Sequence, residues 1–436
     1  MIAARGSIAA LVQWTGLGVA VGVVCGAASA LFLWLLEQAT SYRGAHAGLV
    51  FALPVAGLLL GLLYERFGAS IQAGNNLVID TIHDDGPEIP LRMAPMVLLG
   101  TVFTHLFGGS AGREGTAVQM GASLTDWLAH RLRISGPLRR QLLAAGVAGG
   151  FGSVFGTPVA GAVFGLEFVV LGRVEYRALL PALIAAVVGD LTTRGLGIQH
   201  TVYPAVAALP LSPLVIGKWA LFAVVVAAVS ALFIEAIHFV KKYSTRVLPR
   251  LPLRMLVGGG LVVLLSLLVG THDYLGLGVP TIVRAFSDPT LPASAFALKL
   301  LFTVVTLGAG FVGGEVTPLF FIGACLGNLC APLLGIPLEL CVVVGMVAMF
   351  GACSNAPLAL SIMAVELCGG AVFPHVVIVC VLAYLLTGRR SIYPAQRLGV
   401  GKTGPAANDP PRTPGPPVSP SGPAASSNTL GVSAKM

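Results

Sequence analysis

The chain has 436 residues, of which 56% are hydrophobic and only 10% are charged. Soluble domains carry about 25% charged residues, so this composition excludes an ordinary soluble protein and predicts an all-α polytopic membrane protein. The formal net charge is +8, but the basic residues cluster in short stretches beside apolar runs. Such clustering is a topology signal, and we expect no nucleic-acid partner.

Apolar stretches follow one another along most of the chain. A transmembrane α-helix needs about 20 consecutive apolar residues; several stretches reach that length, and others are short or interrupted by Gly and Pro. We therefore expect tilted, broken and re-entrant helices in a multi-pass protein. The first stretch lacks a small-residue cleavage site near the usual place, so we interpret it as a retained helix. The stretches are 8–36, 50–63, 93–107, 140–171, 178–191, 214–240, 255–270, 295–312, 319–335, 339–353 and 356–387.

The sequence contains an internal repeat. The motif SALF begins at Ser29 and again at Ser230, and the motifs GREGT and GGEVT place glutamates at Glu114 and Glu315, a spacing of 201 residues in both cases. A third pair, FGSVFGTP and FGACSNAP, aligns at a spacing of 199. Three pairs in the same order predict two fused copies of one unit.

The repeat suggests four regions. We expect an N-terminal segment at 1–11, a first membrane repeat at 12–208 and a second at 209–399. The remainder, 400–436, is rich in Pro, Ser and Gly. Such a composition cannot bury a core, so it predicts a disordered tail.

Charge indicates that the second repeat is inverted. The first SALF helix is followed by TSYRGAHAG, with one Arg, and its counterpart by KKYSTRVLPRLPLR, with five Lys and Arg residues. An excess of Lys and Arg marks the cytoplasmic side, so equivalent helix ends face opposite sides. Inverted repeats with interrupted helices are typical of transporters whose substrate binds near the midplane.

Four irregular breaks interrupt the apolar sequence. They are AGNNLVI (73–79), GGSAGREGT (108–116), GAGFVGGEVTP (308–318) and SIYPAQR (391–397). Each of the first three opens into a predicted helix, where several backbone N–H groups lack intrahelical partners. Because helix N-termini attract anions, these breaks predict an anion site.

These segments resemble the CLC-type anion channels and proton-coupled antiporters. GSAGREGTAVQMG is similar to the Gly-Arg-Glu-Gly helix start of that family, and GGEVTP stands where its third signature ends in proline. SIYPAQR supplies Tyr393, matching the tyrosine that closes the family's anion site from the inside. The resemblance covers roughly residues 10–398. It implies a CLC-type inverted repeat and a homodimer.

Three departures resemble the bacterial fluoride/proton antiporter branch. GNNL from residue 74 replaces the common Gly-Ser-Gly-Ile-Pro, and GEVTP from residue 314 replaces Gly-x-Phe-x-Pro. Glu167 is followed by Phe168, whereas chloride/proton exchangers carry a second, proton-relaying glutamate there. The resemblance thus implies a secondary transporter that exports fluoride in exchange for protons across the bacterial inner membrane.

The resemblance also implies the roles of individual residues. Glu114 is the gating and proton-coupling glutamate, and Glu315 and Thr317 act in the proton or fluoride pathway. An intramembrane acid is a functional candidate by default. The residues expected at the anion site are Asn75, Asn76, Arg113, Gly115, Val316 and Tyr393.

Several of these residues keep a second interpretation. Arg113 either holds the loop through carbonyl oxygens or adds positive potential, and Glu315 either pairs with a cation or serves the pathway. Asn75 and Asn76 either favour a turn or donate amide N–H groups to fluoride, a small ion that is costly to dehydrate.

Three further side chains are interpreted as structural. Glu167 and Glu366 are repeat mates on helices that follow proline residues, and we expect both to hold the fold together. His105 is expected to be a packed, hydrogen-bonded histidine.

Two rival functions remain. One is a chloride-preferring CLC-type exchanger or a passive anion channel. The other is an intramembrane enzyme that uses Glu114 and Glu315 as paired acids. The sequence has no Ser/His or metal-ligand arrangement that would support such chemistry, so we expect neither enzymatic activity nor a metal or cofactor.

Overall fold

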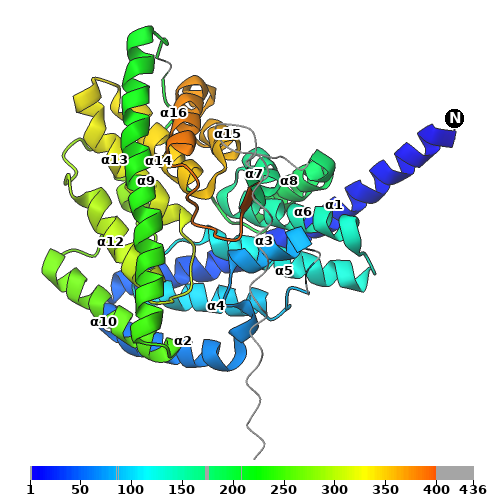
Figure 1. The fold of residues 1–436 in the computed structure, drawn as a ribbon, viewed down its shortest axis with the longest axis horizontal. Coiled ribbons are helices and arrows are strands. Elements are labelled where there is room, and N and C mark those ends of the chain that lie inside the picture. The colour runs from blue at the N-terminus through cyan, green and yellow to red at the C-terminus, as the bar shows by residue number, and fades with distance from the viewer. Residues whose placement is uncertain (1, 85, 87, 172–175, 208, 399–436) are drawn as a thin grey trace, which may run out of the picture.

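The computed structural model describes residues 2–84, 86, 88–171, 176–207 and 209–398. Within them, sixteen α-helices form a packed body from which the N-terminal part of α1 projects (Figure 1). The all-α membrane fold predicted from the sequence is confirmed, with one addition: β1 (Val170–Leu171) and β2 (Arg397–Leu398) form a two-residue parallel pair. The predicted disordered tail at 400–436 lies outside the described residues.

The helices form two series of eight. The first series comprises α1 (Ile2–Ala45), α2 (Leu53–Phe67), α3 (Asn75–Asp84), α4 (Met93–Leu106), α5 (Glu114–Arg131), α6 (Gly136–Phe155), α7 (Pro158–Glu167) and α8 (Leu179–Gly195). The second comprises α9 (Pro213–Val247), α10 (Leu251–Val269), α11 (Val279–Ala285), α12 (Ala295–Gly308), α13 (Val316–Leu334), α14 (Leu338–Ser354), α15 (Pro357–Cys368) and α16 (Phe373–Leu386). Short 3₁₀ helices lie at η1 (Ala47–Ala52), η2 (Ala69–Ile71), η3 (Tyr176–Ala178) and η4 (Gly370–Val372).

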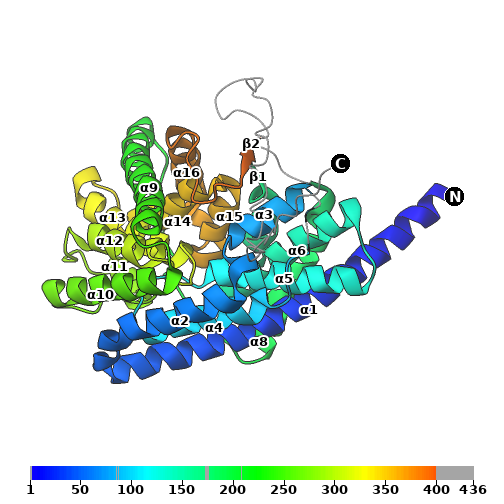
Figure 2. The same cartoon turned by 60° about the horizontal axis from the view of Figure 1, so that its bottom comes forward.

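The second series repeats the first in order and in length. α4 and α12 both have 14 residues, α5 and α13 have 18 and 19, and α7 and α15 have 10 and 12. Figure 2 shows the two series mainly on opposite sides of the body, with α2 and α4 beneath. The boundaries 12–208 and 209–399 stay a prediction, and α1 already includes 2–11.

Among the described residues, six helical segments are long and apolar enough to cross a membrane: Leu11–Ala45, Ala47–Phe67, Tyr176–Gly195, Pro213–Val247, Leu251–Val269 and Val316–Leu334. Other apolar helices are shorter; α4 and α12, at 14 residues each, span about 21 Å at 1.5 Å per residue, less than the roughly 30 Å hydrocarbon core. They agree with the predicted partial helices.

Two predicted boundaries were wrong. The sequence predicts a loop at TSYRGAHAG, but α1 continues to Ala45, because a tertiary contact holds its last turn: Arg43 Nη1 donates to His105 O at 3.2 Å. In the same way, KKYSTR forms the last turns of α9. The basic residues therefore extend from helix ends rather than from loops, and the charge asymmetry between the repeats is retained.

Two long apolar stretches each contain two helices. The stretch 140–171 divides into α6 and α7 at Gly156, whose φ is +74°, and the stretch 356–387 divides into α15 and α16 at Gly369, whose φ is +95°. Both values lie where glycine is favoured. Pro158, at the start of α7, also cannot continue a helix interior.

The two helix pairs are joined by reciprocal caps. The carboxylate of Glu167, at the end of α7, accepts hydrogen bonds from Leu358 N at 3.3 Å and Ala359 N at 2.9 Å, at the start of α15. Glu366, near the end of α15, accepts two bonds of 2.9 and 2.8 Å from the first turn of α7. Each carboxylate thus satisfies free N–H groups of the other helix, which confirms the structural role predicted from the repeat.

The centre of the body is formed by helices that are apolar all round. In α14 every residue from Leu340 to Ser354 is buried. By contrast, α1, α2, α9 and α10 expose large apolar side chains such as Leu31, Leu59, Leu221 and Leu268. A helix that is apolar all round is buried in a core or spans a membrane, so the peripheral helices are suited to face lipid.

Candidate functional site

The site is built where the GREGT and GGEVT loops meet. Gly112 and Gly314 exchange two backbone hydrogen bonds, of 2.6 and 2.8 Å, so the N-termini of α5 and α13 lie next to each other. A Cβ on Gly314 would lie 2.7 Å from Gly115 N, and one on Gly112 would lie 2.9 Å from Glu114 Oε2. The glycines are therefore required for this close approach.

Glu114 is buried at this junction and is 1% exposed. Its carboxylate accepts hydrogen bonds from Thr317 Oγ1 at 2.5 Å, from Thr317 N at 3.2 Å and from Arg113 N at 3.1 Å. A carboxylate held by the first-turn N–H of α13 stands where a helix N-terminus would bind an anion.

The side chain of Arg113 is not the main partner of the Glu114 carboxylate. Its Nε lies 3.6 Å from Glu114 Oε1 and has no hydrogen-bond partner among the described residues, and the side chain is 18% exposed. The adjacent charges therefore form a loose contact, and Glu114 is held chiefly by Thr317 and by backbone.

Glu315 is the repeat mate of Glu114 and has different surroundings. Its Oε2 is buried without a hydrogen-bond partner in the described part of the chain. The residue lines a cavity of about 400 Å³. The cation pairing considered for Glu315 is not among the ion pairs of the described residues.

Three more predicted residues border this cavity. Asn75, the first residue of α3, is 7% exposed, and its Oδ1 has no partner in the described structure. Its Nδ2 would lie 3.1 Å from a Cβ on Gly115. Asn76 Oδ1 accepts a bond from Ala395 N at 3.0 Å. Asn76 therefore anchors the segment that carries Tyr393. The sequence did not indicate this contact.

Tyr393 belongs to a tightly held C-terminal segment. It is 3% exposed, and its ring forms a T-shaped pair with that of Phe168, with centroids 5.0 Å apart. Gln396 Nε2 donates to Phe168 O at 2.9 Å and to Ser354 O at 2.8 Å, and the β1–β2 pair follows directly. These contacts fix the tyrosine at the cavity wall.

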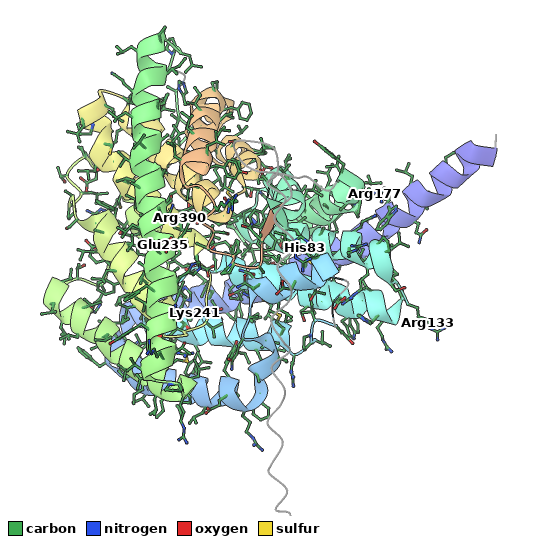
Figure 3. All side chains as sticks on the ribbon, in the orientation of Figure 1. His83, Arg133, Arg177, Glu235, Lys241 and Arg390 are labelled. Carbon is green, nitrogen blue, oxygen red and sulfur yellow. The ribbon has the colours of Figure 1, made fainter. Side chains whose placement is uncertain are left out.

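The cavity also has basic residues that the sequence analysis did not assign to the site. Lys241 and His238 from α9 and Arg254 from α10 line it together with Gln119, and Figure 3 shows Lys241 on α9. Arg254 Nε donates to Ala309 O at 3.2 Å, in the loop before Glu315. The signal was present in the basic stretch KKYSTRVLPRLPLR, which we interpreted only as a topology marker.

The structure thus brings most predicted site residues together. Glu114, Thr317, Gly115, Glu315 and Asn75 surround the Gly112–Gly314 junction, and Val316 is the buried first residue of α13. Arg113 stands at the start of α5, and Asn76 and Tyr393 line the same cavity as Asn75 and Glu315.

His105 is packed as predicted. It is fully buried, with Nδ1 2.8 Å from Thr101 O and Nε2 2.9 Å from Ala111 O. The second contact braces the loop just before Glu114.

Comparisons with known proteins extend over nearly the whole chain. The family model described as voltage gated chloride channel matches residues 56–388. A chloride/fluoride channel protein of Pseudomonas syringae pv. tomato is 45% identical over 403 residues, which cover 90% of this chain and 88% of the relative.

Solved structures agree with this similarity. The crystal structure of a CLC-type fluoride/proton antiporter matches with a TM-score of 0.87 and 35% identity, covering 89% of this chain and 98% of that one. A slow cyanobacterial Cl⁻/H⁺ antiporter matches with a TM-score of 0.78 at 19% identity, covering 87% and 96% of the two chains. The second match bears on the fold alone.

Proposed function

Since the chain belongs to the voltage-gated chloride channel family, we propose that it is a secondary transporter that exports fluoride in exchange for protons. It is a multi-pass protein of the bacterial inner membrane. We further propose, from the family resemblance, that it works as a homodimer, which light scattering of the purified protein tests.

The observation that carries the proposal is the position of the Glu114 carboxylate at the N-terminus of α13. Its contacts with Thr317 N and Oγ1 are those that an anion would make there. An anion can take these donors only when the carboxylate leaves, and protonation weakens its hold because charge-assisted hydrogen bonds are the stronger ones. One site then serves fluoride and a proton in turn.

The cytoplasmic route follows the 400 Å³ cavity. Lys and Arg excess at the ends of α9 and α10 marks this side as cytoplasmic, and the cavity leads from Lys241 to Glu315 and Asn75. Glu315, with an unpartnered carboxylate oxygen, is placed to accept the proton that Glu114 releases. Thr317 stands two residues after Glu315 and donates its hydroxyl to Glu114, so this hydroxyl can pass a proton or bind the anion.

Fluoride rather than chloride is the proposed substrate. Asn75 supplies an amide donor beside the helix N-termini, and direct donors are needed to replace the tightly held water shell of a small ion. The named activities of the Pseudomonas relative and of the solved antiporter support the same choice. The alternative is a chloride-preferring exchanger or a passive anion channel.

Flux from proteoliposomes tests the proposal. We expect fluoride efflux to exceed chloride efflux by at least about tenfold, a difference of about 1.4 kcal/mol, and an imposed pH gradient to drive fluoride uphill. Equal rates for the two ions would contradict the fluoride assignment. Fluoride flux that never runs against its gradient would identify a passive channel.

A further inference from the structure

A second cavity, of about 250 Å³, lies between α3, α6, α7 and η3 and shares no lining residue with the ion pathway. We call it the α3–α6 pocket. Its polar lining consists of His83, Arg140, Gln141 and Arg177, and its apolar lining of Ile82, Pro137, Ala144, Gly165, Leu166 and Val169. Figure 3 labels His83, on α3, and Arg177, on η3.

The described lining of the pocket carries positive charge. Arg140 is half-buried and Arg177 exposed, and neither has an ion-pair partner among the described residues. The described lining contains no carboxylate. Two guanidinium groups beside an imidazole favour a ligand with several acceptor oxygens, because guanidinium matches phosphate geometry with paired N–H donors.

The pocket lies beside the start of a candidate membrane span. The candidate span Tyr176–Gly195 begins one residue before Arg177, and Leu138, Leu179 and Leu183 are 46%, 42% and 38% exposed. Basic residues next to span ends mark the cytoplasmic side, where anionic lipids create a negative surface potential. Cationic side chains stand here beside apolar surface that suits acyl chains.

We propose that the α3–α6 pocket binds the phosphate group of an anionic phospholipid, with Arg140 and Arg177 holding the phosphate oxygens. The glycerol and the first acyl carbons lie along Leu166 and Val169. The apolar half of the lining and the exposed leucines favour a lipid over free phosphate, which would gain nothing from them.

A lipid in this pocket would brace the inner side of the ion pathway. His83 Nε2 lies 2.8 Å from Val169 O, so the pocket joins the C-terminal part of α3 to the end of α7. The other end of α3 begins with Asn75 and Asn76. Val169 precedes β1, which pairs with β2 just after the Tyr393 segment. Both connections end at the 400 Å³ cavity.

Thermal unfolding of the purified full chain in detergent tests the site and needs no transport assay, so its result is independent of the proposed function. The probes are phosphatidylglycerol, phosphatidylcholine and sn-glycerol 1-phosphate. We expect phosphatidylglycerol alone to raise the Tm of the wild type, in a saturable manner. The double variant Arg140→Gln/Arg177→Gln should need roughly thirtyfold more of it, since each basic residue near an anionic surface contributes about fivefold in affinity.

The matched control is Arg131→Gln/Arg133→Gln, which removes the same charge from exposed residues outside the pocket and should respond like the wild type. Should the double variant not fold, Arg177→Gln, at an exposed position, should still weaken the response by about fivefold. An unchanged response in these pocket variants would overturn the site. An equal Tm rise with glycerol phosphate, or with phosphatidylcholine, would overturn the lipid assignment.

Discussion

Glu114 and Glu315 occupy matching positions in the two repeats, yet their carboxylates have opposite surroundings. Glu114 is enclosed by donors from Thr317 and from its own loop. Glu315 Oε2 has no partner in the described structure, and the residue borders the 400 Å³ cavity. Both repeats keep a helix start with a glutamate. The surroundings of the two carboxylates differ because each repeat offers different hydrogen-bond donors to the glutamate of the other.

The threonines two residues after each glutamate explain why the carboxylates have different surroundings. Thr317 Oγ1 donates to Glu114, whereas its mate Thr116 pairs with Thr101 Oγ1 at 2.6 Å and is turned to α4. One acid therefore receives a hydroxyl donor and the other does not. We infer that the enclosed acid closes the anion site and that the open acid exchanges protons with the cytoplasm.

The largest expected effect is that of Glu114→Gln, which removes the enclosed acid. Glutamine cannot exchange a proton at the anion site, so proton uptake under a fluoride gradient should vanish and a pH gradient should no longer drive fluoride uphill. The measurement is proton and fluoride flux from proteoliposomes, with size exclusion to check the fold.

This variant also separates the gate from a structural ion pair. Leaving a buried arginine unpaired would cost about 3–5 kcal/mol, but the Arg113 side chain is 18% exposed and lies 3.6 Å from the carboxylate. We therefore expect a stable protein. Well-folded Glu114→Gln with undiminished coupled proton uptake would show that Glu114 is not the coupling residue.

Glu315→Gln should have the next largest effect. Removal of the open acid takes away the inner proton acceptor while Glu114 remains, so coupled proton flux should fall by roughly tenfold, about 1.4 kcal/mol in the barrier, without complete uncoupling. Glu235→Gln is the matched control, because Glu235 pairs with Arg390 on the exterior of α9 (Figure 3). If both variants transport protons at the wild-type rate, the inner acid has no role in coupling.

The two asparagines should differ from each other. Asn75→Ser removes an amide beside Gly115 and should lower the fluoride-to-chloride ratio by roughly threefold to tenfold, up to about 1.4 kcal/mol. Asn76→Ala should chiefly loosen the Tyr393 segment, because Asn76 accepts a bond from Ala395 N, and should change the ratio less. Flux ratios measured for both variants decide this, and an unchanged ratio in Asn75→Ser would leave that residue as a turn former.

Lys241→Gln should have the smallest effect. Lys241 lines the cavity that leads to the open acid, so its charge should raise the local anion concentration without contacting the gate. We expect an increase of roughly threefold in the half-saturating fluoride concentration at low salt, which disappears at about 1 M salt, where the screening length is about 3 Å. Lys242→Gln, outside the cavity lining, is the control. A salt-independent change would contradict an electrostatic role.

Features set by local sequence were predicted well. The repeat, the three helix starts after glycine-rich breaks and the capping glutamates follow from motifs whose spacing is visible along the chain. Glycine and proline act on the backbone where they stand, so their effects can be located without knowledge of the fold.

Features set by distant contacts were not predictable. The bond from Ala395 N to Asn76 spans 319 residues, and no pattern in either segment indicates it. Lys241 and Arg254 belonged to a recognised basic stretch, but only packing of α9 and α10 places them in the cavity. The helical continuation of α1 and α9 through charged residues likewise depends on tertiary support more than on propensity.

The reciprocal caps have a consequence for biosynthesis. The carboxylate that caps the start of α7 comes from Glu366, and its bond to Val159 N spans 207 residues. At about 5–20 residues per second, the ribosome needs roughly 10–40 s to make that intervening chain. During this interval the first repeat is held in the bilayer with an uncapped helix start, and it acquires its final contacts only when the second repeat arrives. The first repeat therefore completes its packing only together with the second.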